Sequence, residues 1–396
     1  MTVPGYVDAR RPTRIFVDAH VFDGEHQGSR TYLQGLYQAL SKVTTDVEVT
    51  LAARNIAQLE DCFAGCRGIR FETLRSKGSY ARLGYEMPRL IAAGEYDYAH
   101  FQYIRPIRAA ARVIVTMHDA LVFSHPALFP PAFVARSAPL FLASAHASDV
   151  LTTVSNFSRD EISRWMLVRK ARVHVVPNGV SETFFDQRES SRQAERCRGR
   201  HGLGRYIVYV SRFERRKNQH GLVRAWVDAG LPQRGIALLL VGSRRQAYPE
   251  LKAEIDRLPA ETALQLKILE GVSDEDLQGL ISGSQGFVYP SLAEGFGIPP
   301  LEAAAMQVPV ICSKRTAMRD YDFLGDDLFD PADHPAMVGL LQRMIASPPE
   351  PRLLARRAEV VRQRYTWQSV ASRFLQVLRE DAASRQQRSP RERSGS

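Results

Sequence analysis

The sequence predicts an α/β protein with two doubly wound parallel-sheet domains that face each other across a cleft. A chain of 396 residues is too long for one ordinary hydrophobic core and favours two domains. Short, apolar, β-branched runs alternate with longer helical stretches, which is typical of parallel strands joined by right-handed crossovers. This alternation occurs twice, and the charged, strand-free stretch 188–204 separates the two series.

The predicted strands are short, and several are apolar on both faces, as expected for strands that helices cover on both sides. In the first half they are 14–19, 47–53, 96–102, 112–119, 149–155 and 172–178. In the second half they are 206–212, 237–243, 266–272, 286–291 and 309–313. Ligands of such sheets bind beyond the C-terminal ends of the strands, so the cleft between the domains is the predicted binding site.

These patterns also set the predicted domain boundaries. The N-terminal domain covers 1–187 and the C-terminal domain covers 205–364, with 188–204 as the linker between them. A final helical stretch follows at 365–381. The basic tail, 382–396, is predicted to be disordered because its composition cannot support a core.

The composition, with 44% apolar and 24% charged residues, is that of a soluble globular protein. No apolar run approaches the roughly 18–20 residues needed to span a bilayer, and the N-terminus has no apolar signal region. We therefore expect the chain in the cytoplasm. Its 4 cysteines do not make a disulfide framework, and Cys62-x3-Cys66 has no second ligand pair nearby, so reduced thiols are expected.

The formal net charge of +10 lies partly in the basic tail. The rest is compatible with nucleic acid, an anionic membrane surface or a phosphate-bearing substrate. No RNA- or DNA-binding signature is present, so we do not expect nucleic acid as a partner. Peripheral contact with the inner face of an anionic membrane remains compatible with the charge.

The segment 291–305, SLAEGFGIPPLEAAA, follows a predicted strand and places Glu294 at its C-terminal end, facing the cleft. Gly295 and Gly297 let the backbone approach a ligand closely. One of the two prolines that follow is predicted to be the first helical residue, which puts Glu302 in the first turn of that helix.

A helix N-terminus presents unpaired N–H groups and a partial positive charge, which suit a phosphate. The segment therefore offers amides for an anion, and Glu294 and Glu302 as acceptors for hydroxyls. Hydroxyls beside phosphates describe a sugar nucleotide. The alternative interpretation is that Glu302 only complements the helix dipole and that Glu294 is a solvated loop acid.

A second cluster, SRFERRKN, follows the strand 206–212 and precedes a predicted helix. Arg212 leaves the strand end and Lys217 lies near the start of the helix. Two cations there could neutralise a pyrophosphate and the charge that grows on it as a leaving group. The alternative is a solvated basic loop, because Arg215 and Arg216 are there too.

The first half adds two further candidates. His118, in HDA, ends a predicted strand and is expected to point toward the same cleft, although a lone histidine is often a structural residue. Gly28 and Ser29 open a helix after the first strand and could bring backbone N–H groups to a phosphate from the opposite side. The loop is not a G-x-G-x-x-G fingerprint, which argues against a nicotinamide dinucleotide.

Together these segments resemble a known family. Glu-x7-Glu within EGFGIPPLEAAAMQVPVI, SRFERRKN, HDA, VSNFSRDEI (154–162) and VVPNGV (175–180) resemble the retaining GT-B glycosyltransferases of family four, also called group 1. The resemblance runs over roughly 14–380, and its loops are similar to those of bacterial polysaccharide mannosyltransferases. It implies that the N-terminal domain lies on the acceptor side. It also implies that the C-terminal domain binds the nucleotide sugar and that the helix 365–381 packs back on the N-terminal domain.

The resemblance also implies roles for the matching residues. Glu294 would bind hydroxyls of the donor sugar, Glu302 the ribose hydroxyls, and His118 would lie near the transferred sugar. Arg212 and Lys217 would hold the diphosphate. The other donor-binding positions implied are Gly28, Ser29, Gly295, Phe296, Gly297 and Ile298.

The reaction implied is metal-independent hexosyl transfer with retained anomeric configuration, in which the leaving phosphate accepts the proton of the acceptor. GDP-mannose is the first candidate donor, and the acceptor is a saccharide or is lipid-linked. Two Asp-x-Asp pairs, Asp274/Asp276 and Asp320/Asp322, have the spacing that metal-dependent glycosyltransferases of another fold use. That spacing is short enough for chance matches, and no metal or other cofactor is expected.

Two other functions stay open on the residues. One is a sugar-nucleotide epimerase, or another enzyme on the same architecture, and the other is a non-catalytic binding protein with a degenerate site. The sequence also departs from the family's pattern. QGSRTY stands where many members have two adjacent glycines, and KRTAMRDYDF (314–323) is basic and bulky where a small-residue stretch is usual. At Ser29 and from Ser313 to Arg319 the sequence therefore does not match the family's pattern.

Overall fold

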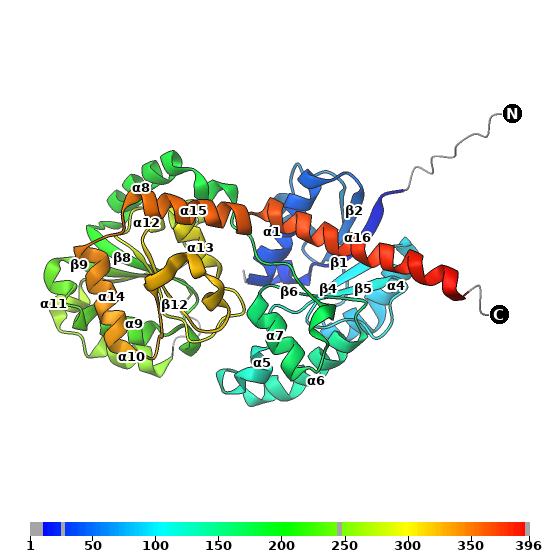
Figure 1. Ribbon diagram of the computed structural model, residues 1–396, viewed down its shortest axis with the longest axis horizontal. Helices are drawn as coiled ribbons and strands as arrows, with labels where there is room; N and C mark the ends of the chain where they lie inside the picture. Colours follow the sequence, from blue (N-terminus) through cyan, green and yellow to red (C-terminus); the bar gives the residue numbers. More distant parts are fainter. Residues whose placement is uncertain (1–10, 25–27, 244–247, 393–396) are drawn as a thin grey trace.

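The computed structural model describes residues 11–24, 28–243 and 248–392, with side chains to residue 385. It shows two α/β domains side by side, each built around a parallel sheet with helices on both faces (Figure 1). The predicted fold class of two doubly wound parallel-sheet domains is confirmed.

The sheet of the first domain has seven parallel strands in the order β3-β2-β1-β4-β5-β6-β7. The strands are β1 (Thr13–Asp18), β2 (Val47–Ala53), β3 (Ile69–Thr73), β4 (Tyr98–Gln102), β5 (Arg112–Thr116), β6 (Val150–Thr153) and β7 (Val173–Val175). The helices are α1 (Gly28–Val43), α2 (Ile56–Cys62), α3 (Ser79–Ala81), α4 (Met87–Gly94), α5 (Leu121–Ser124), α6 (Pro131–Ala147) and α7 (Asn156–Trp165).

Successive side chains of β1 point to opposite faces of the sheet and so belong to two different hydrophobic cores of this domain. Ile15 and Val17 belong to the core that contains α1 side chains such as Leu36, and Phe16 belongs to the core beneath α4 and α6. Because both faces of the strand are buried at its centre, Ile15, Phe16 and Val17 are apolar in succession, which is why this strand could be predicted from the sequence.

The sheet of the second domain has six parallel strands in the order β10-β9-β8-β11-β12-β13. The strands are β8 (Arg205–Val210), β9 (Ile236–Val241), β10 (Leu266–Leu269), β11 (Phe287–Tyr289), β12 (Val310–Ser313) and β13 (Leu328–Phe329). The helices are α8 (Gln187–His201), α9 (Gln219–Asp228), α10 (Pro249–Asp256), α11 (Ala260–Ala263), α12 (Asp274–Ser282), α13 (Ile298–Ala305), α14 (His334–Ala346) and α15 (Pro351–Tyr365).

The stretch 188–204 is not a linker, which corrects the prediction. It forms most of α8, which packs on α12 as part of the second domain. The Asp186 carboxylate caps the helix by accepting from the amides of Arg188 and Glu189 at 3.1 Å each, and the helix ends at Gly202, whose φ is 58°. The charge-rich sequence is helical because its small residues form one buried stripe.

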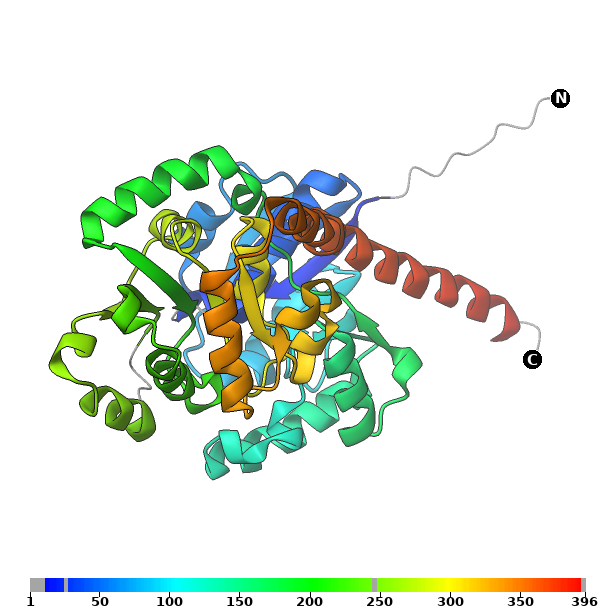
Figure 2. The ribbon, with the colours of Figure 1, turned by 60° about the vertical axis from the view of Figure 1, so that its left-hand side comes forward.

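The C-terminal helix α16 (Trp367–Glu392) begins two residues later than predicted and runs farther. The described part of the tail, 382–392, is helical and not disordered, and 393–396 lie outside the described residues. The helix lies against α1 of the first domain, and its end projects beyond the domain (Figure 2). Asp381 holds it there, accepting from Arg112 at 2.9 and 2.6 Å and from the Tyr98 hydroxyl at 2.8 Å.

The chain passes between the domains at two places that lie side by side. The first passage is at Val180 and the return is at Tyr365 and Thr366, just before α16. The amide of Val180 donates to the carbonyl of Tyr365 at 2.6 Å, and Val180 and Thr366 form an isolated parallel bridge. We call this pair of segments the double crossing.

Among the described residues, no helix is both long enough and apolar enough to cross a lipid bilayer.

Candidate active site

The order of the strands explains why distant segments meet in the cleft. In the second sheet, β8 and β11 are neighbours, and they are the strands at which the direction of the connections reverses. The loops that follow two such strands leave in opposite directions and form a crevice at their carboxyl ends. The loop after β8 carries Arg212 and Lys217, and the loop after β11 carries Glu294.

A cavity of about 470 Å³ lies at this crevice and is lined by both domains. Every residue that the sequence analysis proposed for the site lines this one cavity. They are Gly28, Ser29, His118, Arg212, Lys217, Glu294, Gly295, Phe296, Gly297, Ile298 and Glu302.

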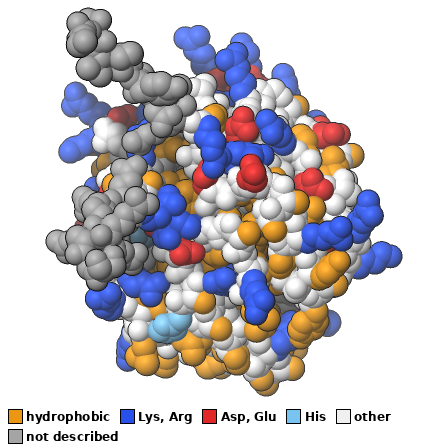
Figure 3. All heavy atoms as spheres, turned by 90° about the vertical axis from the view of Figure 1, so that its right-hand side faces the viewer, with side chains coloured by type: hydrophobic (Ala, Val, Ile, Leu, Met, Phe, Trp, Pro, Cys, Tyr) orange, Lys and Arg blue, Asp and Glu red, His pale blue; other side chains and the backbone are white. Residues whose placement is uncertain are grey.

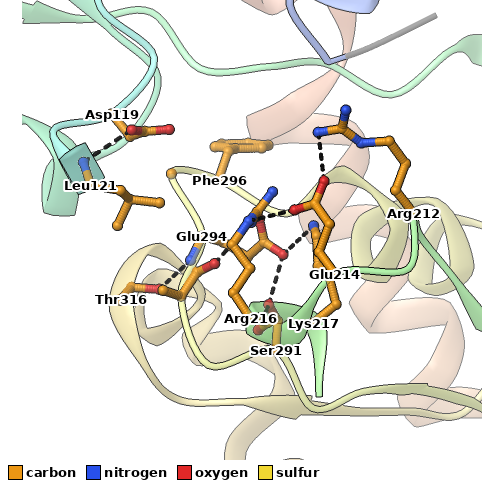
Figure 4. A network of polar contacts seen from close by, with 12 residues as sticks. Asp119, Leu121, Arg212, Glu214, Arg216, Lys217, Ser291, Glu294, Phe296 and Thr316 are labelled. Carbon is orange, nitrogen blue, oxygen red and sulfur yellow. Dashed lines mark hydrogen bonds and ion pairs between the residues drawn. The ribbon is translucent and has the colours of Figure 1, made fainter. Parts of the chain in front are cut away.

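Glu294 is the centre of a polar network in the cavity wall (Figure 4). Its Oε1 accepts from the Lys217 ammonium and from the hydroxyls of Tyr289 and Ser291, the last two at 3.0 and 2.8 Å. Its Oε2 accepts from Arg216 at 2.7 Å. Burial alone would raise the pKa of Glu294, but Lys217 and Arg216 outweigh this effect and lower it to about 2. Glu294 is therefore ionised at neutral pH.

Lys217 is buried, and the local backbone directs it toward Glu294. It ends the 3₁₀ turn Arg215–Lys217, and the next residue, Asn218, has a φ of 58°. Asparagine tolerates this left-handed conformation, and its side-chain amide donates to the carbonyls of Pro290 at 3.2 Å and Pro331 at 3.4 Å. Asn218 thus joins the loop after β8 to the loop after β11.

Arg216 is a central member of the network that the sequence analysis left in a solvated basic loop. Its guanidinium donates to Glu214 at 2.8 Å and to Glu294 at 2.7 Å, and its side chain is only 16% exposed. Arg212 binds the other oxygen of Glu214 at 2.9 Å and is 48% exposed at the cavity rim. The three cations Arg212, Arg216 and Lys217 outnumber the two carboxylates that pair with them, so this cluster has a net positive charge.

The glycine loop after Glu294 is held between the two domains. A Cβ atom on Gly295 would lie 2.8 Å from the Cβ of Asp119 and 2.9 Å from the carbonyl oxygen of His118, so only glycine fits. The hydroxyls of Ser155 and Ser158 both donate to the Gly295 carbonyl, at 2.8 and 3.2 Å. Both serines belong to the segment VSNFSRDEI of the first domain, which therefore positions this loop.

The helix after this loop begins at Ile298, one residue before the predicted prolines, and corrects the position of Glu302. Glu302 starts the second turn of α13 instead of lying in the first. Pro299 and Pro300 have no N–H group, so the donors available to an anion here are the backbone amides of residues 295–298. The left-handed φ of 94° at Gly297 gives the loop its turn into the helix.

Glu302 is the carboxylate of the cavity that is free to accept hydrogen bonds. Within the part of the chain that the structure describes, no polar side chain or amide pairs with it. Burial, together with the nearby carboxylate of Asp274, raises the pKa of Glu302 to about 8. Glu294 and Glu302 therefore differ in both charge and partners, although each is a glutamate of the same short segment.

His118 lies just beyond β5 in the wall contributed by the first domain. Its Nε2 is 2.7 Å from the Gln102 side-chain oxygen, so Nε2 carries the hydrogen and Nδ1 is left as an acceptor. Burial lowers its pKa to about 4, so the imidazole is neutral at physiological pH. The Tyr32 and Tyr103 rings, with centroids 5.1 and 5.5 Å away, hold it in place.

Asp119, the next residue, also lines the cavity and was not proposed from the sequence. Its Oδ1 accepts from the amide of Leu121 at 3.0 Å (Figure 4). Its Oδ2 accepts from the Tyr103 hydroxyl at 3.3 Å. Burial raises the pKa of this carboxyl group. The signal in the sequence was its position in HDA at a strand end, the same signal that pointed to His118.

The basic segment 314–323 supports the glycine loop through hydrogen bonds to its backbone. The Thr316 hydroxyl accepts from the amide of Glu294 at 2.9 Å, and the Tyr321 hydroxyl donates to the carbonyls of Phe296 at 2.7 Å and Gly297 at 2.8 Å. Its departure from the family's pattern is thus a packing feature beneath the loop.

Three of the four acids of the Asp-x-Asp pairs have protein partners. Asp276 pairs with Arg200 at 2.5 Å, Asp322 pairs with Arg364 at 2.8 Å, and Asp320 accepts from the amides of Asn156 and Phe157.

Comparison with known proteins matches each half of the chain to a glycosyltransferase family. Residues 193–361 match the family described as Glycosyl transferases group 1, and residues 26–184 match Glycosyltransferase Family 4. Together the two matches cover both domains and the cavity between them. The chain is a family-four, group 1 glycosyltransferase.

Relatives of this glycosyltransferase include two mannosyltransferases. The O-antigen chain mannosyltransferase B of Escherichia coli is 26% identical over 299 residues, which cover 74% of this chain and 77% of that protein. The MMP alpha-(1->4)-mannosyltransferase of Mycolicibacterium hassiacum is 31% identical over 257 residues, which cover 62% of this chain and 54% of that protein. The match to the second relative thus spans only about half of its length.

The glycosyltransferase also shares its fold with a solved structure, Anabaena Alr3699/HepE in complex with UDP and glucose. The TM-score is 0.71 at 17% sequence identity, over 93% of this chain and 100% of that one. The predicted GT-B architecture of the glycosyltransferase is therefore confirmed.

Proposed function

We propose that this glycosyltransferase transfers a hexose from a nucleotide-diphosphate sugar to a saccharide or lipid-linked acceptor, with retained anomeric configuration and without a metal ion. The observation that supports this donor class is the second-domain wall of the cavity. There a positively charged cluster, the amides of residues 295–298 and the free carboxylate of Glu302 lie together. Mannose is the first candidate sugar, and GDP-mannose the first donor, because both relatives described above are named mannosyltransferases.

The diphosphate would lie between the two domains. Arg212 at the rim and the amides of residues 295–298 would bind it from one side. On the other side, the 16-residue helix α1 begins at Gly28, so its positive end points at the same space from the first domain. Glu302 would accept hydrogen bonds from the ribose hydroxyls.

The ion pairs of Glu294 would prepare the cations for the reaction. Glu294 fixes Arg216 and Lys217 in the cavity wall, so these charges need no large reorganisation when negative charge grows on the leaving diphosphate. Lys217 would act on the diphosphate while remaining beside Glu294. The lone pairs of Glu294 that do not already accept from protein groups would then orient the hydroxyls of the transferred sugar.

In the reaction, the bond between the anomeric carbon and the phosphate oxygen would break. A bond from the acceptor oxygen would form on the same face of the sugar. The proton of the acceptor hydroxyl would pass to the departing phosphate oxygen, so no protein base is required. His118, neutral and with Nδ1 free to accept, would bind a hydroxyl of the transferred sugar instead of exchanging a proton.

The test has a binding stage and a transfer stage. GDP-, UDP- and ADP-linked hexoses are compared by thermal shift, and a donor at 100 times its Kd should raise the free energy of unfolding by about 2.7 kcal/mol. The stabilising donor is then incubated with mono- and oligosaccharide acceptors, and the anomeric configuration of the product is read by NMR.

A matched variant, Glu302→Gln, should keep the stability of the free protein near neutral pH and lose most of the stabilisation by donor. Failure of every sugar nucleotide to stabilise the protein would refute the donor class. Conversion of the donor to its epimer without an acceptor would instead assign the cavity to the epimerase alternative.

A further inference from the structure

A second cavity lies between the two domains. Its volume is about 490 Å³, close to the 470 Å³ of the candidate active site. Val154 and Phe296 line both cavities, so the glycine loop that contains Phe296 separates the two spaces. We call the second cavity the arginine pocket, because Arg319, Arg364 and Arg373 line it.

Three parts of the chain that are distant in the sequence form the walls of the arginine pocket. The first domain contributes the segments that follow β6 and β7, including Asn156 and Pro177. The second domain contributes residues 319–322 of the basic segment 314–323, together with Arg364 at the end of α15. Arg373 comes from α16. A ligand in this pocket would therefore contact both domains and the helix that returns to the first.

The guanidinium groups of the arginine pocket use few of their N–H donors. Among the described residues, Arg373 has no acid or other acceptor as a partner. The acids nearest to Arg319 lie at 3.6 and 3.8 Å, too far for a hydrogen bond. Arg364 gives one hydrogen bond, to Asp322 at 2.8 Å. Three cations thus face the two carboxylates of Asp320 and Asp322, and most of the N–H donors remain available to a ligand.

The basic residues on another part of the surface do not converge in this way. On the face of the first domain that Figure 3 shows, Lys and Arg side chains are scattered, and Asp and Glu lie among them. Three guanidinium groups around one hollow repel one another, and an anion bound between them removes this repulsion.

The chemistry of the walls specifies a phosphate ester of a sugar. The planar fork of an arginine matches a phosphate group with two parallel hydrogen bonds. A phosphate group alone would fill only a small part of the cavity. The side chain of Asp322 is 69% exposed and keeps an oxygen that can accept from sugar hydroxyls. The rings of Phe296, Tyr321 and Tyr365 add apolar surface for the carbon skeleton.

Two aromatic residues join the arginine pocket to the loop that is proposed to bind the donor. Tyr321 donates to the carbonyls of Phe296 and Gly297, at 2.7 and 2.8 Å. Tyr365 packs edge-on against Phe296, with ring centroids 5.8 Å apart, and its carbonyl accepts the hydrogen bond of the double crossing. A ligand that contacts these two rings would therefore hold both the glycine loop and the crossing in place.

We propose that the arginine pocket binds a small sugar phosphate, and that this ligand strengthens donor binding by holding the glycine loop between the two domains. Because the ligand contacts both domains, it binds best to the arrangement in which they are close. By linkage, the donor and the sugar phosphate then raise each other's affinity by the same factor. The effect on the donor rests on the proposed function, whereas the binding of the sugar phosphate does not.

The test measures binding of mannose 6-phosphate, glucose 6-phosphate, inorganic phosphate and mannose by isothermal titration calorimetry. One molecule of a sugar phosphate should bind per chain, inorganic phosphate should bind more weakly, and mannose should not bind. The double variant Arg319→Gln/Arg373→Gln should raise the Kd of the sugar phosphate about tenfold or more, because it removes charge-assisted hydrogen bonds.

The matched control is Arg352→Gln/Arg356→Gln, which removes the same charge from exposed positions of α15 outside the pocket. This variant should keep the Kd of the wild type, and circular dichroism should show that both double variants are folded. No binding of either sugar phosphate, or the same Kd in both double variants, would overturn the proposal. Binding lost in Arg212→Ala but kept in Arg319→Gln/Arg373→Gln would overturn it too, because the ligand would then lie in the candidate active site.

The effect on the donor is measured with the sugar nucleotide that stabilises the protein. A saturating sugar phosphate should lower the Kd of this donor about fivefold or more in the wild type, and should not lower it in Arg319→Gln/Arg373→Gln. An unchanged donor Kd with the pocket occupied would refute the coupling between the two cavities. If no sugar nucleotide binds, the proposed function fails, while the titrations with sugar phosphates still decide whether the arginine pocket is a binding site.

Discussion

Replacing Glu302 by Gln is expected to abolish the rise in donor affinity between about pH 6 and 8. Burial and the nearby Asp274 carboxylate raise the pKa of Glu302 to about 8, so most molecules carry the protonated acid below that pH. Ribose hydroxyls that donate to Glu302 need its ionised form, because the protonated acid offers a donor of its own in place of one acceptor. Donor binding should therefore strengthen as pH rises.

The size of the effect follows from the fraction of ionised carboxylate. With a pKa of about 8, about one molecule in a hundred is ionised at pH 6 and about half are ionised at pH 8. The apparent Kd of the donor should then fall about fifty-fold over this range, because affinity scales with the competent fraction. Glu302→Gln cannot ionise, so its Kd should stay weak and show no such fall. Burial lowers the pKa of Lys217 to about 8, so partial loss of that charge should if anything raise the Kd of this variant slightly near pH 8.

Isothermal titration calorimetry with the intact sugar nucleotide measures the Kd of the donor and the number of protons released on binding. The diphosphate of the intact donor stays ionised across this range, so the ligand adds no titration of its own. Buffers with different ionisation enthalpies report the protons released, which should approach one per donor at pH 6 for wild type and zero for Glu302→Gln.

A second variant, Asp274→Asn, separates this explanation from a general effect of pH on the fold. Removing the nearby carboxylate should lower the pKa of Glu302 and move the rise in affinity to lower pH. A flat profile in the wild type, or the same slope in wild type and Glu302→Gln, would refute the assignment of Glu302 to the ribose.

Three further predictions concern the rest of the cavity. Lys217→Ala and Arg212→Ala should each lower kcat about 10²–10³-fold. Only Lys217→Ala should also lower the free energy of unfolding in denaturant, by about 3 kcal/mol, because it removes a buried partner of Glu294. Near-normal kcat/KM in both variants would exclude them from the diphosphate. Gly295→Ala should reduce kcat, because its Cβ would lie 2.8 Å from the Cβ of Asp119, while Gly199→Ala, where no atom lies within 4 Å, should leave kcat unchanged. Equal kcat for wild type and Gly295→Ala would show that the domains need not approach so closely. Turnover should survive EDTA, and a loss that manganese or magnesium restores would contradict the metal-independent reaction.

The cavity could be predicted largely because its residues follow strand ends. Parallel strands buried on both faces are recognisable as apolar runs, and the carboxyl ends of such strands meet in space. Glu294 and Arg212 were therefore placed in one cleft without knowledge of Glu214 and Arg216, which link them. The pairing of the strands β8 and β11, which brings the two loops into contact, is a property of the sheet order that the strand pattern alone does not specify.

Other features were missed for physical reasons that can be named. The helix α8 buries Ser190, Ala194 and Cys197, and such small residues leave little hydrophobic signal in a run that is otherwise charged. The strands β3 and β13 were not predicted because each lies at the edge of a sheet, the first with alternating polar residues and the second only two residues long. Arg216 differs from its exposed neighbour Arg215 only through the direction of its side chain.

The double crossing restricts how the two domains can move relative to each other. Both covalent connections lie side by side at one edge of the cleft. They can therefore act as a hinge, and the domains can rotate about it without stretching either segment. A twist about the perpendicular axis would shear the hydrogen bond between Val180 and Tyr365, and is therefore resisted. We expect the cleft to widen and narrow along a single arc. Each closure would then return Gly295 to the same place against His118 and Asp119, so that one path of motion restores the alignment of donor and acceptor walls in every catalytic cycle.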